Sequence, residues 1–346
     1  MTVREPLTYR DAGVDLDAAA ATKQRLRELV ESTRTEAVQS GFGSFGGRLA
    51  AAGEELVASA DGVGTKLEVA IRSGRHDTVG EDLVNHCVND ILAEGATPLA
   101  FLDYFACGEL DPEVAVEVVG GVARGCRRNG CALLGGETAE MPGFYLPGTY
   151  DLAGFILGRM AFREVAARDL RAGDSLLGLA SSGIHTNGFS FVREVLFERM
   201  GLEAADPWPG LGASVADVLL SVHRSYLEVL RGACEQRRIR ALAHITGGGI
   251  PGNLGRILPA EIDAVVDVES WAPPPEFRFL AEWSGAAPEE MYRVFNMGVG
   301  MIAVVSPSDL DAVEAAVRDG GCGTVRCGHL DEGSGQVRMP GADVVP

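Results

Sequence analysis

The sequence has no apolar run approaching the roughly 18 residues that a membrane-spanning helix needs. Its first residues, MTVREPLTYRDAGVD, contain no apolar signal segment. It also lacks any C-x-x-C pair, although seven cysteines are spread along it, a pattern typical of free thiols in a reducing compartment. We therefore expect a cytoplasmic protein with no membrane partner.

Positive charge is scarce. The 346 residues contain 30 Lys and Arg against 49 Asp and Glu, a formal net charge of -19. Such a chain repels a phosphate backbone instead of releasing its counterions, so nucleic acid is not an expected partner. A small phosphate-bearing ligand would need a local device, such as loop N–H groups, a helix N-terminus, a lysine or a divalent metal.

Several catalytic patterns are missing as well. The zinc spacing H-E-x-x-H does not occur, and the stretch ASSG is not a G-x-S-x-G nucleophile elbow. No glycine directly precedes the lysine of SADGVGTK, so this segment is not a Walker loop. Zinc hydrolases, serine hydrolases and P-loop proteins are thereby excluded, and 46% apolar content indicates an ordinary folded chain.

Periodicity predicts two domains, residues 1–168 and 169–346, and an α/β (α+β) fold class. The first has expected strands and helices in alternation: strands at 54–61, 66–71, 99–106, a short one from 131, and 150–160, helices at 17–33, 78–95 and 112–130. The second repeats that alternation: a first strand within 170–182, then strands at 239–245, 262–268, 298–305 and 324–330, and helices from about 187, at 215–232 and at 309–321. The helix at 78–95 begins with a Thr-x-x-Glu capping box.

Glycine-rich segments interrupt both halves. SGFGSFGG, residues 40–47, holds four glycines in eight positions and is either a flexible connector or a lid over a ligand. In SADGVGTK, residues 59–66, Lys66 is either a phosphate-facing charge or an ordinary surface lysine. TGGGIPG, residues 246–252, is either an anion site or a structural turn.

Three acids end separate elements beside glycine turns: Asp61, Asp90 and Glu137. Any one of them alone would more often be a cap or an ion-pair partner, but their shared setting favours a magnesium site, because Mg²⁺ takes hard oxygen ligands. Asp90 also lies in the last turn of its helix, where the dipole disfavours an anion, so a nearby cation is expected.

The histidines differ in setting. His185 lies in SSGIHTNG between two glycines, where a histidine can donate to an anion or exchange a proton near neutral pH. We interpret His86 as part of the solvated polar face of the 78–95 helix. His223, His244 and His329 have no comparable setting.

Seven segments in chain order carry a resemblance: YRDAGVDLDA, DGVGTK, NDILAEGATPLAFLDYFA, LLGGETAEMPGFY, SSGIHTNGFS, HITGGGIPGNLGRILP and FNMGVGM. Together they closely resemble the phosphoribosylformylglycinamidine cyclo-ligase family, also called aminoimidazole ribonucleotide synthetases, over nearly the whole chain. DILAEGATP also fits the D-x4-G-A-x-P signature of the wider ATP-using superfamily. Many relatives have serine where Thr186 stands.

The resemblance implies a step of de novo purine biosynthesis. ATP would phosphorylate the formyl oxygen of formylglycinamidine ribonucleotide, and ring closure would give aminoimidazole ribonucleotide, ADP and phosphate. It also implies a two-domain synthetase fold whose N-terminal sheet forms a half-barrel, completed in a homodimer, followed by a C-terminal α/β domain. Another ATP-dependent enzyme of the superfamily, or a non-catalytic nucleotide-binding relative, is the alternative.

The family's functional residues map onto this chain by motif. The implied catalytic residues are His185, Lys66 and Asp90, and the implied Mg²⁺ ligands are Asp61, Asp90 and Glu137. The implied ATP contacts are Gly41, Gly43, Gly46, Gly47, Asp61, Gly62, Gly64, Thr65, Lys66, Asp90, Gly136 and Glu137. The implied substrate contacts are His185, Thr186, Asn187 and Gly188.

Overall fold

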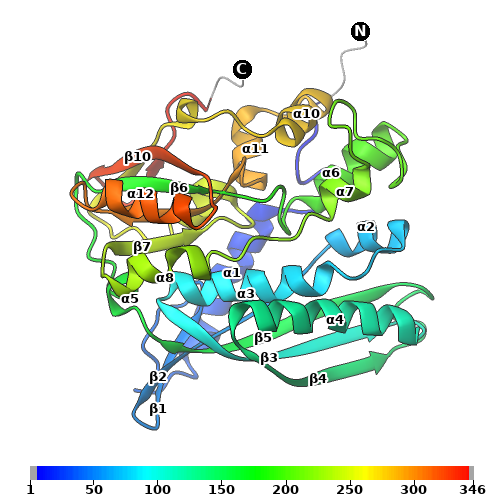
Figure 1. Ribbon diagram of the computed structural model, residues 1–346, viewed down its shortest axis with the longest axis horizontal. Coiled ribbons are helices and arrows are strands. Elements are labelled where there is room, and N and C mark those ends of the chain that lie inside the picture. The colour runs from blue at the N-terminus through cyan, green and yellow to red at the C-terminus, as the bar shows by residue number, and fades with distance from the viewer. Residues whose placement is uncertain (1–5, 343–346) are drawn as a thin grey trace.

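The computed structural model describes residues 6–342 and contains two sheets with a helix between them (Figure 1). Five strands from the first half form one sheet in the order β1-β2-β5-β3-β4. Six strands from the second half form the other in the order β11-β8-β10-β6-β9-β7. Helix α3 lies between the first sheet and strand β7 of the second. Within the described residues no helix is both long and apolar enough to cross a membrane.

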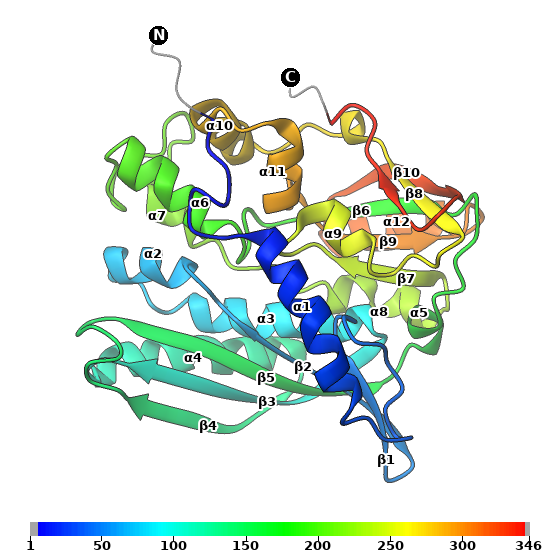
Figure 2. The same ribbon diagram turned by 180° about the vertical axis from the view of Figure 1, so that it is seen from behind.

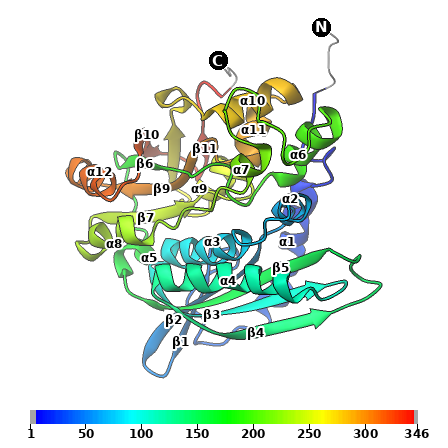
Figure 3. The same cartoon turned by 45° about the vertical axis from the view of Figure 1, so that its right-hand side comes forward.

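The first sheet is antiparallel except for the parallel pair β3 and β4. Helices α3 and α4 pack on the same face of it (Figure 3). Its strands are β1 (Gly47–Ala51), β2 (Glu54–Gly62), β3 (Ala96–Cys107), β4 (Ala132–Glu140) and β5 (Tyr150–Met160). The helices of this half are α1 (Leu16–Glu31), α2 (Lys66–Ser73), α3 (Val79–Ala93), α4 (Pro112–Asn129) and α5 (Arg163–Ala167).

The second sheet is antiparallel except for the short pair β11 and β8. Its strands are β6 (Ser175–Ala180), β7 (Ile239–His244), β8 (Ile262–Val266), β9 (Val299–Val305), β10 (Thr324–Glu332) and β11 (Val337–Arg338). The helices are α6 (Phe189–Arg193), which continues as a π-helical turn over Glu194–Arg199, α7 (Val215–Leu219), α8 (Leu227–Glu235), α9 (Gly249–Leu254), α10 (Pro275–Ser284), α11 (Pro288–Val294) and α12 (Leu310–Asp319).

Helix α3 is buried between the two halves of the molecule. All of its residues are buried, including a polar face that the sequence suggested was solvated. That interpretation is wrong because the second half of the chain covers this face. The predicted capping box is also absent, since the Thr78 side chain makes no cap hydrogen bond and Glu81 pairs with Arg124 and Arg128 of α4.

Residues 66–71 form the start of helix α2 and not the predicted strand. Leu67, Val69 and Ala70 are buried, and a short apolar run of this kind fits either period. Gly74 ends the helix in the left-handed conformation. The predicted helix at 215–232 is likewise two helices, α7 and α8, joined by an irregular segment at 220–226 that reaches α3.

Some apolar surface remains uncovered. Leu102, Tyr104 and Phe155 are 38%, 39% and 43% exposed. Leu102 and Phe155 are cross-strand partners, so they share the face opposite α3. Helix α1 runs along the outside of the molecule (Figure 2) and contains no buried residue, with Leu29 66% exposed.

Candidate functional site

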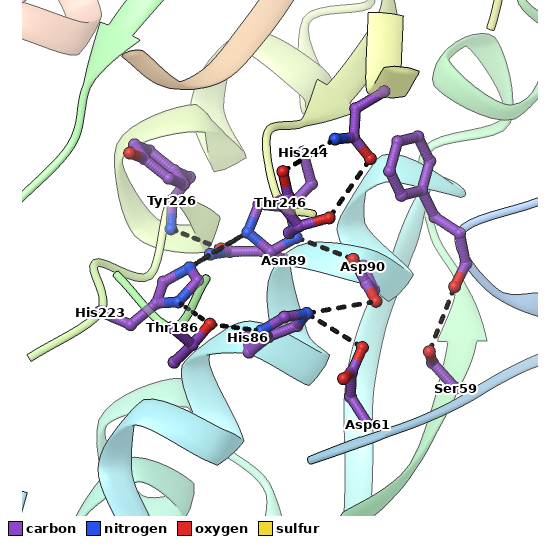
Figure 4. Close-up of polar contacts among 12 residues, drawn as sticks. Ser59, Asp61, His86, Asn89, Asp90, Thr186, His223, Tyr226, His244 and Thr246 are labelled. Atoms are coloured by element: carbon purple, nitrogen blue, oxygen red, sulfur yellow. Dashed lines mark hydrogen bonds and ion pairs between the residues drawn. The ribbon is translucent and has the colours of Figure 1, made fainter. Parts of the chain in front are cut away.

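The candidate site lies where β2, α3 and loops of the second half converge (Figure 4). Asp61 is near the end of β2, and His86 and Asp90 are one turn apart on α3. The i, i+4 spacing puts both side chains on one helix face. His244 ends β7 and faces the same point from the second sheet. Segments far apart in the sequence therefore build one buried polar cluster.

Hydrogen bonds join this cluster into a chain. His86 contacts Asp61 through Nε2 (3.0 Å) and the Thr186 hydroxyl through Nδ1 (2.8 Å). The Thr186 hydroxyl lies 3.3 Å from His223 Nδ1, and His223 Nε2 lies 3.0 Å from His244 Nε2. His244 Nδ1 ends the chain 2.7 Å from Asp90 Oδ1. Asp90 Oδ2 lies 3.9 Å from His86 Nε2, which closes the ring.

Charge is concentrated at one side of the ring. Burial disfavours a charged His86, but the carboxylates of Asp61 and Asp90 outweigh it and raise the pKa of His86 to about 9. Burial likewise acts against the Asp61 carboxylate, but His86 and the Gly62 N–H lower the pKa of Asp61 to about 2. His86 is therefore an imidazolium between two carboxylates, and it supplies the cation expected beside Asp90.

The other histidines of the cluster are neutral. Burial, and then the positive charge of neighbouring groups, lowers the pKa of His185 and of His223 well below the ordinary value. Burial also lowers the pKa of His244, although Asp90 opposes it. These three side chains therefore act as hydrogen-bonding groups and not as charges near neutral pH.

One arrangement of protons satisfies the bonds that link His86, Thr186, His223, His244 and Asp90, although it leaves the Asn89 Nδ2 donor 3.2 Å from the protonated His223 Nε2. Neutral His244 donates Nδ1–H to Asp90, so its Nε2 accepts a proton from His223 Nε2. His223 Nδ1 is then an acceptor for the Thr186 hydroxyl, whose oxygen accepts Nδ1–H from His86. The hydrogen bonds run in one direction, from the His86 imidazolium to the Asp90 carboxylate.

His185 stacks on this chain without joining it. Its ring lies 3.9 Å from that of His223, at 20°, and its Nε2 accepts the Ser182 N–H at 3.1 Å. Its backbone φ is +66°, a left-handed conformation that non-glycine residues adopt at a cost and that clusters at functional sites. A Cβ on Gly300 would lie 2.5 Å from the His185 ring. Burial lowers the pKa of His185, so its ring is neutral here, and the expected proton exchange stays a prediction.

Lys66 does not face an open phosphate site. Its side chain is fully buried, and Nζ lies 2.8 Å from Asp82 Oδ2 and donates to the Ser221 carbonyl at 2.8 Å. The other Asp82 oxygen accepts the His223 N–H at 2.7 Å. The phosphate-facing prediction is corrected on this geometry: Lys66 and Asp82 fasten the 220–226 segment to α3.

Glu137 is not brought to the other two acids within one chain. It lies in edge strand β4 and is exposed. The path from β4 to Asp61 crosses three strand pairs. Gly136, next to Glu137, is paired with Asp103 of β3, and Asp103 is paired with Gly154 of β5. Gly154 is in turn paired with Asp61 of β2. Three strand spacings, roughly 14 Å, therefore separate this position from Asp61.

The 40–47 glycine segment is anchored at its far end. Phe45 is buried, its N–H donates to Glu94 at 3.0 Å, and the Arg256 guanidinium lies 4.0 Å from the centre of its ring. Arg256 also donates to the Gly43 and Ser44 carbonyls. A free connector is therefore excluded in this conformation, whereas Gly41 and Gly43 have open space around them.

The other predicted contacts lie on both sides of the cluster. The Gly62 N–H donates to Asp61 at 2.9 Å, and the Thr65 hydroxyl lies 3.1 Å from that of Ser190. A Cβ on Gly188 would lie 2.2 Å from the Phe295 ring, so glycine is required there. Asn187 Oδ1 lies against Gly247 of the 246–252 turn, and its buried Nδ2 has no partner among the described residues.

Part of the site fits a magnesium ion. Asp61 keeps an exposed side chain fraction of 39%, so an approaching ion can reach its oxygens. Carboxylate oxygens are the ligands that Mg²⁺ prefers. The ligand atoms of His86, Asp90 and His244 also lie within 4.8 Å of one another. Both histidines and Asp90 Oδ1 are engaged in hydrogen bonds, whereas Asp90 Oδ2, 3.9 Å from His86, remains open to an ion.

Sequence reasoning missed three members of the cluster: His86, His223 and His244. Two of them had a signal. His86 is four residues before Asp90 on a helix, and His244 precedes the TGGG turn. Nothing local distinguishes His223, whose role depends on contacts with α3 and β7.

Comparisons with known proteins agree with this architecture. The chain is 49% identical over 311 residues to a protein of Nitratidesulfovibrio vulgaris (strain DSM 19637 / Miyazaki F) named phosphoribosylformylglycinamidine cyclo-ligase, covering 88% of this chain and 89% of that protein. Two solved structures share the fold. A Thermus thermophilus protein matches 94% of this chain and 98% of its own with a TM-score of 0.65 and 21% identity. AaThiL complexed with AMPPCP and TMP matches 96% of this chain and 97% of its own with a TM-score of 0.65 and 16% identity.

Family models match both halves. Residues 47–160 match the N-terminal domain of AIR synthase related proteins, and residues 171–339 match the C-terminal domain. The first range spans the five-stranded sheet, and the second contains the six-stranded one. The chain belongs to the AIR synthase related protein family.

Proposed function

We propose that this protein closes the imidazole ring of aminoimidazole ribonucleotide from formylglycinamidine ribonucleotide, with ATP converted to ADP and phosphate. The 49% identity to a cyclo-ligase over 88% of the chain carries this proposal. The buried cluster supports it, because it combines acids suited to a metal–nucleotide complex with a glycine-framed loop suited to a substrate.

The acids belong to the nucleotide side of the proposal. Asp61 and Asp90 would hold Mg²⁺, which when bound would neutralise phosphate charge. The bends at Gly62 and Gly64 would bring backbone N–H groups close to phosphate oxygens. The 40–47 segment would cover the nucleotide, since it is anchored through Phe45 while Gly41 and Gly43 stay unobstructed.

The loop from His185 to Gly188 belongs to the substrate side. Phosphorylation of the formyl oxygen converts a poor leaving group into phosphate, and the amidine-side nitrogen then attacks the formyl carbon. His185 and Thr186 are held at fixed positions by the stack on His223 and the bond to His86. Their neutral, preorganised groups are suited to orienting the two reacting ends of one molecule.

A homodimer is part of the proposal. The apolar face around Leu102, Tyr104 and Phe155 has no cover in one chain, and a second copy placed there would complete the half-barrel. Glu137 would reach a nucleotide only in such an assembly. Sedimentation of Phe155→Asp should show monomers, whereas an unchanged dimer would remove this face from the interface.

The activity is tested by ADP release in a coupled assay with purified protein. Turnover should require formylglycinamidine ribonucleotide, and aminoimidazole ribonucleotide should appear in equal amount with ADP. ATP turnover that ignores this substrate would favour another ATP-dependent enzyme of the superfamily. Nucleotide binding without any turnover would favour a non-catalytic relative.

A further inference from the structure

The end of helix α4 has a hydrogen-bond pattern that brings two cysteines together. Gly130 is in the left-handed conformation, and its N–H donates to the Arg127 carbonyl at 3.3 Å. The next N–H, of Cys131, donates to the Cys126 carbonyl at 3.0 Å. These two bonds define a Schellman motif, in which the side chains at the first and last positions are commonly in contact.

Here both contacting side chains are thiols. The two thiols are close enough for each to shift the pKa of the other. A disulfide needs Cα atoms about 4.4–6.8 Å apart, and the backbone bond between the same two residues holds them side by side. Closing the bond therefore demands side-chain rotation and no unfolding of α4.

The two thiols have different reactivities. Cys126 is 2% exposed, and the hydrogen bond to Cys131, followed by burial, raises its pKa. Cys131 is partly exposed, and the hydrogen bond from Cys126 lowers its pKa. A thiolate is the reactive form of cysteine, so Cys131 is the nucleophile of the pair and Cys126 the resolving thiol.

We propose that Cys126 and Cys131 form a reversible intramolecular disulfide when the protein meets a peroxide. The Cys131 thiolate attacks one peroxide oxygen, the O–O bond breaks, and with one proton taken up a sulfenic acid and water result. The Cys126 sulfur then displaces the sulfenic oxygen, which leaves as a second water. In total two thiols are oxidised and one hydrogen peroxide is reduced to two waters.

The chain contains a natural comparison at the end of α8. The backbone of Arg237 is in the left-handed conformation there, and its N–H donates to the Cys234 carbonyl at 2.9 Å. The backbone N–H of Arg238 donates to the Ala233 carbonyl at 3.0 Å. The backbone motif is the same, but its contacting positions are Ala233 and Arg238. Cys234 is buried and burial raises its pKa to about 12, so it should stay reduced.

Tryptic mass spectrometry tests the proposal directly. Arg127 and Arg128 lie between the two cysteines, so trypsin places Cys126 and Cys131 on separate peptides that remain joined only by a disulfide. The protein is treated with a few equivalents of hydrogen peroxide, alkylated and digested. We expect the joined peptides to become the main form of both cysteines, and dithiothreitol to separate them.

Variants make the test specific. Cys131→Ser should leave Cys126 alkylated after peroxide, and Cys126→Ser should leave Cys131 as a sulfenic acid that a dimedone probe traps. Cys234→Ser should not change the yield of joined peptides. Cys126 and Cys131 both recovered as alkylated thiols, or joined instead to cysteines elsewhere, would overturn the proposal.

Discussion

Two histidines of the cluster, His86 and His223, are both buried, at 4% and 0% exposure, and yet carry different charge. The pKa of His86 is raised to about 9, with burial opposed by two carboxylates, whereas burial and nearby cations lower the pKa of His223 well below its ordinary value. Both rings bond to the same Thr186 hydroxyl. Neighbouring acids, and not depth of burial, therefore decide which imidazole is a cation.

His86 and His223 are also held by different acids. Asp61 and Asp90 contact the His86 ring, whereas Asp82 holds His223 only through its backbone N–H and is itself neutralised by Lys66. The charged side lies toward the proposed metal, and the neutral side lies toward the proposed substrate loop. The predictions below test this contrast between the charged and the neutral histidine.

The largest effect is expected from Lys66→Met, which leaves the buried Asp82 carboxylate unpaired. Loss of one partner of a buried ion pair costs roughly 3–5 kcal/mol, so the free energy of unfolding in urea should fall by that amount. Turnover should fall as well, because the 220–226 segment that carries His223 loses its anchor.

The double variant Lys66→Met/Asp82→Asn separates anchoring from phosphate contact. The introduced amide would be neutral, and its oxygen could still accept the His223 N–H, so stability and kcat should recover in large part. The KM for ATP should stay within about twofold of wild type. A tenfold higher KM for ATP in both variants would restore the phosphate-facing role of Lys66.

Asp90→Asn would shift the pKa of His86 toward that of His223. The amide oxygen can still accept from His244, so the fold should persist, but one of the two carboxylates that stabilise the imidazolium is lost. Because Asp90 is also a proposed Mg²⁺ ligand, we expect turnover to fall about 100-fold, the order of loss that follows removal of one preorganised electrostatic group from an active site. The pKa of His86, followed by NMR, should fall. Unchanged turnover would place the metal elsewhere.

The pH dependence of stability provides a third test, in metal-free protein with EDTA. The folded-state pKa of His86 is raised from 6.5 to about 9, so its contribution is fully present below pH 6.5 and is lost as pH rises through 9. That contribution is about 3 kcal/mol. His86→Gln should flatten the unfolding free energy between pH 6.5 and 9, and an equally steep decline would assign the effect to another group.

The groups with lowered pKa values affect the free energy of unfolding at low pH. Asp61, with a pKa of about 2 instead of 3.8, contributes stability above pH 3.8 that is lost as pH falls through 2. His185 and His223 favour the neutral form, so their contribution is lost as pH falls below 6.5. Maximal stability is therefore expected near pH 6.5, and a maximum above pH 9 would contradict the assigned charges.

Most elements of the fold could be predicted from the sequence, because their periodicity is long and their ends are marked. The helix at 112–130 has an aspartate cap and a terminal glycine, and the structure places α4 at Pro112–Asn129. The strand predicted at 66–71 was wrong because so short an apolar run fits both the helical and the strand period. Helices α10 and α11 were not predicted, although Pro275 and Pro288 each stand at a helix start.

The site was harder to predict than the fold. Asp61 and Asp90 stand out because each follows or precedes a glycine turn. The bond between His86 and Thr186 joins residues 100 positions apart, and no local pattern announces such a contact. Burial of α3 by the second half reversed the interpretation of its polar face, since a sequence alone does not say which polar face another part of the chain will cover.

The smallest effect is expected from Thr186→Val, which removes the hydroxyl shared by the two histidines. His86 Nδ1–H and His223 Nδ1 would each lose a partner in a buried place, at about 1–3 kcal/mol. Thr186→Ser is the matched control, because its hydroxyl can still accept from one ring and donate to the other, and it should retain stability and kcat. In ¹⁵N spectra of Thr186→Val the proton on His223 should no longer be fixed at Nε2. A His223 tautomer that stays unchanged would mean that His244 alone sets it, and that the charged and neutral sides of the cluster are not coupled through Thr186.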